Sequence, residues 1–164
     1  MQRSIFGPAP CPRRLLWRTS IFWRRLSTSN PARFGYLDHT GVAAFLSAVA
    51  GALKPQAKLV IATGMTAESI LPTLVQKRWH RLDDLVVLSQ NRYDPWESRL
   101  DIDYTFVRGS SLETGPTESY VFTAAELRRM LNAAGFDTLS FQGSAAGEPY
   151  RLGSPRLIII AQRR

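Results

Sequence analysis

The run Lys58 to Thr63 (KLVIAT) is the feature that most restricts how this chain can fold. It is short, rich in β-branched residues and without alternation of apolar and polar positions, which is typical of a strand buried on both faces of a central sheet. Before it, apolar residues recur at helical spacing from Val42 to Leu53, with Thr40 as the expected N-cap and Pro55 just beyond the end. A helix that leads into a buried strand predicts the α/β class.

The rest of the chain predicts antiparallel strands and a further helix. A helix is expected from Ala67 to Lys77, with a break at Pro72. Thr123 to Glu126 has the pattern of a capping box, and the helix that it starts ends at Gly135. Strands are expected at 85–89, 99–108 and 118–122, as an antiparallel β insertion at about 85–122, and at 136–141 and 156–161, as a closing hairpin.

Positive charge is concentrated at the front of the chain. Seven arginines precede the first acidic residue, Asp38, whereas residues 34–164 carry 14 basic and 13 acidic residues. The net charge of +8 therefore belongs to an Arg-, Pro- and Ser-rich leader, residues 1–33, which we expect to be disordered. Such a leader is also typical of an organellar transit peptide or of a tail that binds nucleic acid or anionic lipid, and these alternatives stay open. We do not expect the nearly neutral domain to bind nucleic acid.

Other function classes are excluded by composition. The single cysteine, Cys11, excludes a disulfide scaffold, and no apolar stretch is long enough to span a bilayer. We therefore expect a cytoplasmic protein, or one targeted to an organelle if the leader is a transit peptide.

Three stretches carry a family resemblance in their order along the chain. They are Phe34-Gly-Tyr-Leu-Asp-His39, Ala52-Leu-Lys-Pro55 and Glu126-Leu-Arg-Arg-Met-Leu-Asn-Ala-Ala-Gly-Phe136. Together they resemble the second half of a class I S-adenosylmethionine-dependent methyltransferase, over about residues 34–164. The resemblance implies a partial Rossmann-like methyltransferase sheet that ends in an antiparallel hairpin, with the insertion covering the substrate. It also implies methyl transfer from S-adenosylmethionine to a small-molecule or peptide N or O nucleophile.

Cofactor binding in this family requires a strand followed by a glycine-rich loop, because only backbone without side chains can lie close to the ligand. No two of the 11 glycines lie two residues apart, so the chain has no G-x-G motif. We therefore expect the cofactor-binding half to be lacking, the domain to be truncated, and S-adenosylmethionine to bind weakly or not at all. A separate chain that supplies this half is an alternative. A non-catalytic interaction module with a basic leader that binds anionic lipid or nucleic acid is another.

Candidate site residues follow from the resemblance. The loop that starts at residue 34 passes beside the cofactor in the resembled family, and the insertion and final connection lie near the acceptor. We expect cofactor contacts from Phe34, Gly35 and Tyr36, and acceptor contacts from Arg92, Tyr104, Tyr120, Tyr150 and Arg151.

No catalytic residue and no metal ligand is assigned. The pair Asp38–His39 is either a base beside the acceptor or a solvated pair at the start of a helix. His80 and its acidic neighbours lack the spacing of metal ligands. A partial sheet also leaves one edge of the 58–63 strand exposed unless the leader covers it, so we expect self-association through that edge.

Overall fold

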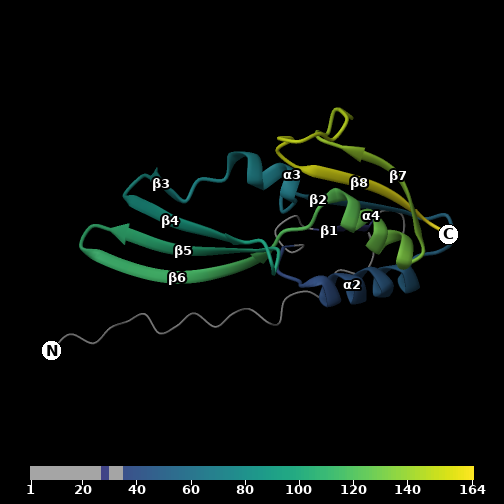
Figure 1. Cartoon of the computed structure of the whole chain (residues 1–164), viewed down its shortest axis with the longest axis horizontal. Coiled ribbons are helices and arrows are strands. Elements are labelled where there is room, and N and C mark those ends of the chain that lie inside the picture. Colours follow the sequence, from purple (N-terminus) through teal and green to yellow (C-terminus); the bar gives the residue numbers. More distant parts are fainter. Residues whose placement is uncertain (1–26, 30–34) are drawn as a thin grey trace.

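The structure is a computed structural model that describes residues 27–29 and 35–164. It contains two four-stranded sheets, one in an α/β core and one that projects from it (Figure 1). The core sheet has the order β1-β2-β8-β7, in which β1 and β2 are parallel and the other neighbours are antiparallel. Its strands are β1 (Ser27–Ser29), β2 (Lys58–Thr63), β7 (Phe136–Gln142) and β8 (Leu157–Arg163). The α/β class and the closing hairpin are confirmed.

Two helices, α2 (His39–Ala52) and α4 (Ala124–Ala133), pack on the core sheet. The capping box at the start of α4 is confirmed. The N-cap of α2 is Asp38, whose carboxylate accepts a hydrogen bond from the Gly41 amide at 2.7 Å, so the prediction of Thr40 is wrong. Both residue types cap helices well, and only the backbone position decides between them.

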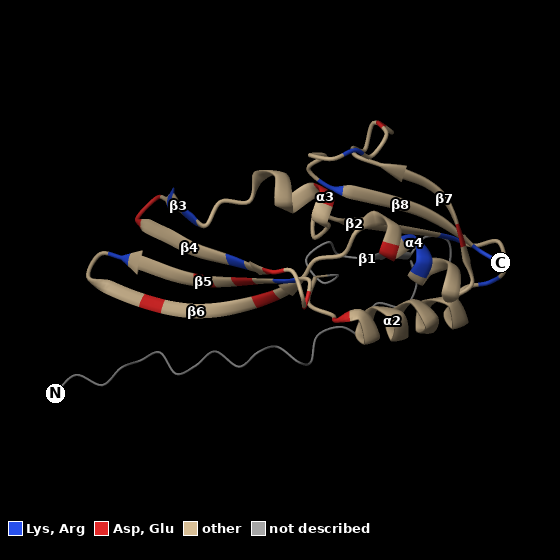
Figure 2. Cartoon of the chain, viewed as in Figure 1, with Lys and Arg blue, Asp and Glu red and all other residues tan. Residues whose placement is uncertain are grey.

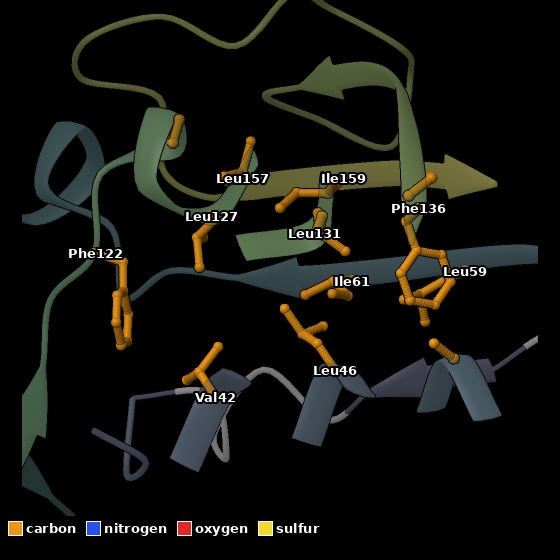
Figure 3. Packing of buried hydrophobic residues seen from close by; sticks show 13 residues of the cluster. Val42, Leu46, Leu59, Ile61, Phe122, Leu127, Leu131, Phe136, Leu157 and Ile159 are labelled. Carbon is orange, nitrogen blue, oxygen red and sulfur yellow. The ribbon is translucent and has the colours of Figure 1, made fainter. Parts of the chain in front are cut away.

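The core lies between the sheet and these two helices (Figure 3). Val42 and Leu46 of α2 face Leu127 and Leu131 of α4 and the buried residues of the strands. Burial alternates along β2, with Leu59, Ile61 and Thr63 buried and the residues between them less so. The prediction of a strand buried on both faces is therefore wrong for the described residues, because both core helices pack on the same face.

The projecting sheet has four antiparallel strands in chain order, not the three expected. They are β3 (Lys77–Leu82), β4 (Leu85–Asp94), β5 (Arg99–Arg108) and β6 (Ser111–Tyr120). The predicted helix from Ala67 is shorter: α3 (Ala67–Ile70) continues as the 3-10 helix η1 (Leu71–Thr73) and ends around Pro72. The insert sheet thus starts at Lys77 rather than at about 85.

The insert leaves the core and returns to it at one place. The Ala67 amide donates to the Phe122 carbonyl at 2.9 Å, and the Phe122 amide donates to the Met65 carbonyl at 3.4 Å. Thr66 and Phe122 form a parallel bridge between these bonds. The insert is therefore a separate sheet whose first and last residues are paired with each other at the end of β2.

β1 lies within residues 1–33, the range expected to be a disordered leader, and the rest of that range is outside the described residues. It pairs with Leu59 to Ile61 of β2, so this part of the edge expected to be exposed is covered. Gln56, in the turn between α2 and β2, takes a φ of 65°. Among the described residues, no helix is long and apolar enough to cross a membrane.

Candidate functional site

The parallel strands β1 and β2 end at the same edge of the core sheet. In open α/β sheets ligands bind beyond the carboxyl ends of the strands. Here the backbone at Gly35 meets the exit of β2: a Cβ on Gly35 would lie 2.7 Å from Met65 Cγ. The Gly35 carbonyl accepts a hydrogen bond from the Tyr120 amide at 2.7 Å. We call the meeting point of Gly35, Met65, Thr66, Tyr120 and Phe122 the carboxyl edge.

The predicted cofactor residues have different surroundings. Phe34 lies outside the described residues. Gly35 is buried in the carboxyl edge, and the neighbouring Tyr36 side chain is 59% exposed. Their contact with a cofactor stays a prediction.

Three hydroxyl groups link the connection between β7 and β8 to the carboxyl edge. Thr66 Oγ1 donates to Ser69 Oγ at 2.9 Å, and the Tyr150 hydroxyl lies 2.6 Å from Thr66 Oγ1 and 2.9 Å from Ser69 Oγ. Each hydroxyl has one proton and two lone pairs, so the three form a ring in which each donates once and accepts once. Thr66 and Ser69 are buried, so this ring fixes the connection in place. Arg151, the next residue, is exposed.

The predicted acceptor residues of the insert are separated along it. Arg92 Nη2 donates to Asp101 Oδ2 at 3.2 Å, and Arg99 Nε donates to Asp101 Oδ1 at 2.8 Å. Burial would raise the pKa of Asp101, but the hydrogen bonds from the two arginines lower it below its usual value. Arg92 therefore belongs to an ion-pair cluster at the root of the insert. Tyr104 stacks on Phe106, with ring centroids 5.8 Å apart, farther out on β5.

Glu126, at the start of α4, makes a contact that the sequence did not reveal. Glu126 Oε2 accepts hydrogen bonds from the Thr123 amide and hydroxyl, both at 2.7 Å. Its other oxygen, Oε1, lies 3.6 Å from His39 Nε2, and the His39 ring contacts the Phe122 ring edge-on with centroids 4.8 Å apart. Burial would raise the pKa of Glu126, but the hydrogen bonds from Thr123 and the nearby imidazole lower it below its usual value. The carboxylate is thus charged at neutral pH.

Only the capping box signalled Glu126 in the sequence, because that motif is local. The approach of His39, at the start of another helix, is a tertiary contact.

No group of three or more His, Cys, Asp or Glu side chains in residues 27–29 and 35–164 is arranged to hold a metal ion. Figure 2 shows acidic and basic residues interspersed over the described elements.

Solved structures superpose on most of this chain. The CcbJ methyltransferase from Streptomyces caelestis superposes with a TM-score of 0.71 at 15% identity, over 85% of this chain and 59% of that one. An S-adenosylmethionine-dependent methyltransferase from Clostridium acetobutylicum gives 0.72 at 12% identity, with the same coverage. CalS10, an amino pentose methyltransferase from Micromonospora echinaspora with S-adenosylmethionine bound, gives 0.59 at 16% identity, over 85% and 58%. No family model and no curated protein sequence matches the chain.

These similarities establish the fold. The chain has the mixed α/β fold of S-adenosylmethionine-dependent methyltransferases and spans less than two thirds of the length of the structures that it matches. The described residues supply the carboxyl edge. They include no G-x-G turn of the kind that lets the backbone lie close to a cofactor in such sheets. By themselves they do not fit the cofactor.

The hydroxyl ring makes Tyr150 a test of how the β7–β8 connection is held. Tyr150→Phe removes two hydrogen bonds and leaves the buried Thr66 and Ser69 hydroxyls incompletely paired, which should lower the free energy of unfolding by about 1–3 kcal/mol. Urea unfolding measures this change. Tyr36→Phe, which alters an exposed ring, is the matched control and should have no effect. Equal stability of the two variants would contradict the role given to the ring.

The low pKa of Glu126 predicts a pH-dependent contribution to stability. A carboxylate with a lower pKa in the folded than in the unfolded state stabilises the fold above the unfolded pKa, and this contribution is lost as the pH falls through the folded pKa. Below about pH 4.5 the free energy of unfolding should therefore fall more steeply for the wild type than for Glu126→Gln. Urea unfolding at several pH values provides the measurement, with the exposed Glu113→Gln as control. Parallel curves for wild type and Glu126→Gln would refute this assignment.

Proposed function

We propose that this chain forms the acceptor-binding part of an S-adenosylmethionine-dependent methyltransferase domain. Its methyl acceptor is a small molecule or peptide with an N or O nucleophile. The observation that carries the proposal is the sheet order β1-β2-β8-β7 with an antiparallel insert rooted at the carboxyl edge, in a chain of which 85% superposes on the matched methyltransferases. In the resembled family the insert covers the substrate, and Arg92, Tyr104, Tyr120, Tyr150 and Arg151 are the proposed acceptor contacts.

The same proposal includes weak binding of the cofactor by this polypeptide alone. Gly35 and Tyr36, with Phe34, are the proposed contacts beside it, and no G-x-G motif accompanies them. Without a glycine-rich loop the ligand loses the backbone donors that hold it in sheets of this kind. Activity then requires a cofactor-binding half, either on the same polypeptide or on a separate chain.

Titration of the isotopically labelled chain with S-adenosylmethionine tests both parts. We expect amide shifts in the NMR spectrum at Gly35, Met65 and Thr66, with a Kd of about 1 mM or weaker. The matched control is S-adenosylmethionine titrated into Gly35→Gln, whose larger side chain would displace Met65 and block the edge. A micromolar Kd would contradict weak binding, and ligand-induced shifts confined to residues away from the carboxyl edge would contradict the proposed function.

A non-catalytic interaction module is the second candidate, supported by the seven arginines that precede Asp38. If these arginines bind duplex DNA together, log K should fall with log salt concentration at a slope of about −6. Fluorescence anisotropy with a labelled duplex measures this slope, and vesicles with anionic lipid provide the membrane equivalent. Deletion of residues 1–33 should abolish binding in either case. Binding that survives the deletion, or that ignores salt, would exclude this candidate.

Two further parts of the proposal concern the state of the protein in the cell. We propose self-association through an exposed sheet edge, because β1 and β7 are the outer strands of the described core sheet and unpaired edges invite pairing. Sedimentation velocity detects it. We also propose the cytoplasm as the compartment, or an organelle if the leader is a transit peptide.

A further inference from the structure

His39 and Glu126 form a carboxylate–imidazole pair beside the carboxyl edge. Glu126 is held through Oε2 by two hydrogen bonds from Thr123, which leaves Oε1 facing His39 Nε2 at 3.6 Å. The buried ring of Phe122 supports the imidazole from the side. The two groups that contact the imidazole, the Glu126 carboxylate and the Phe122 ring, are thus each held in place by other contacts.

The carboxylate decides which nitrogen of a neutral His39 carries the proton. A negative charge beside Nε2 favours the tautomer with the proton on Nε2, so the lone pair is on Nδ1. No described residue is hydrogen-bonded to Nδ1, and the His39 side chain is 52% exposed. Nδ1 is therefore a basic atom open to a ligand.

Phe122 connects this base to the candidate acceptor site. Its amide and carbonyl are hydrogen-bonded to Met65 and Ala67 at the exit of β2, while its ring contacts His39. The imidazole therefore contacts the residue at which the insert, proposed to cover the acceptor, returns to the carboxyl edge.

We propose that His39, oriented by Glu126, accepts a proton from an ammonium group bound at the carboxyl edge. This inference rests on the proposed function. In the step, an N–H bond of the ammonium breaks and its electron pair stays on the nitrogen as a lone pair, while the proton forms a bond to Nδ1. The products are a neutral amine, which is nucleophilic, and an imidazolium whose charge Glu126 offsets. His39 is the catalytic residue of this step and Glu126 is a positioning residue.

Base strength selects the substrate class. An ordinary imidazole has a pKa near 6.5, an α-amino group near 7.7–8.0 and a lysine-type amine near 10.4. Of the two amines, the α-ammonium group is therefore the one from which an imidazole accepts a proton more readily. A neutral hydroxyl resembles water, whose pKa lies far above that of any of these amines, so an imidazole is too weak a base to deprotonate it. The pair thus fits a weakly basic amine and not an alcohol.

The chain has only two histidines, His39 and His80, which makes the imidazole directly observable. Long-range ¹H–¹⁵N NMR spectra of the full chain, with labelled histidine, report the protonation of each ring nitrogen. Glycinamide is the amine probe, and glycolamide, with a hydroxyl in place of the amine, is its matched control. Exposed His80 on β3 is the internal control.

We expect His39 to have its proton on Nε2 and glycinamide to shift its Nδ1 signal toward the protonated value, with no change from glycolamide and none at His80. Glu126→Gln should reduce the Nε2 tautomer of His39 toward the proportion seen in His80. Glu113→Gln, which removes an exposed carboxylate on β6, should retain it.

Three results would overturn the inference. One is a neutral His39 with its proton on Nδ1; another is an equal response to glycinamide and glycolamide. The third is a shift of the Gly35 and Thr66 amides by glycinamide with no response at His39, which would leave an acceptor site without this base. Failure of the proposed function itself is read separately, from the titration with S-adenosylmethionine.

Discussion

Two backbone hydrogen bonds join the start and the end of the insert, and the arrangement of the candidate site depends on them. They connect Ala67 and Met65, at the exit of β2, with Phe122, which follows β6. The insert strands pair along their whole length with each other, and the core holds them at this junction and through the hydrogen bond from the Tyr120 amide to the Gly35 carbonyl. The entropy of closing a long loop grows slowly with its length, so one well-paired root suffices. The projecting sheet in Figure 1 is the result.

The same junction brings the chemistry of distant segments together. Phe122 is held by the end of β2, its ring supports His39 from α2, and the capping box of α4 begins at the next residue, Thr123. A motif that satisfies the amides of a helix N-terminus therefore also aims a carboxylate at an imidazole. Also at the end of β2, the Thr66 hydroxyl is hydrogen-bonded to the hydroxyl of Tyr150.

Elements with a strong local pattern were predictable, and elements without one were not. The capping box and apolar stripe predicted α4, and the β-branched runs predicted β2 and β8. β3 was missed because all six of its residues are exposed, which removes the alternation that marks a strand. The start of β6 was missed because Gly115 and Pro116 are typical of turns, although proline is tolerated on an outer strand such as this one.

The sequence by itself determined the properties that depend on neighbours a few residues apart: the capping box of α4, the apolar periods of the helices, the uneven charge and the absence of a G-x-G motif. Only the tertiary structure decided which side chains meet. Tyr150 reaches Thr66 across 84 positions, and His39 approaches Glu126 from a separate helix. Such contacts depend on how helices pack on a sheet and where an insert returns, and no local propensity encodes either.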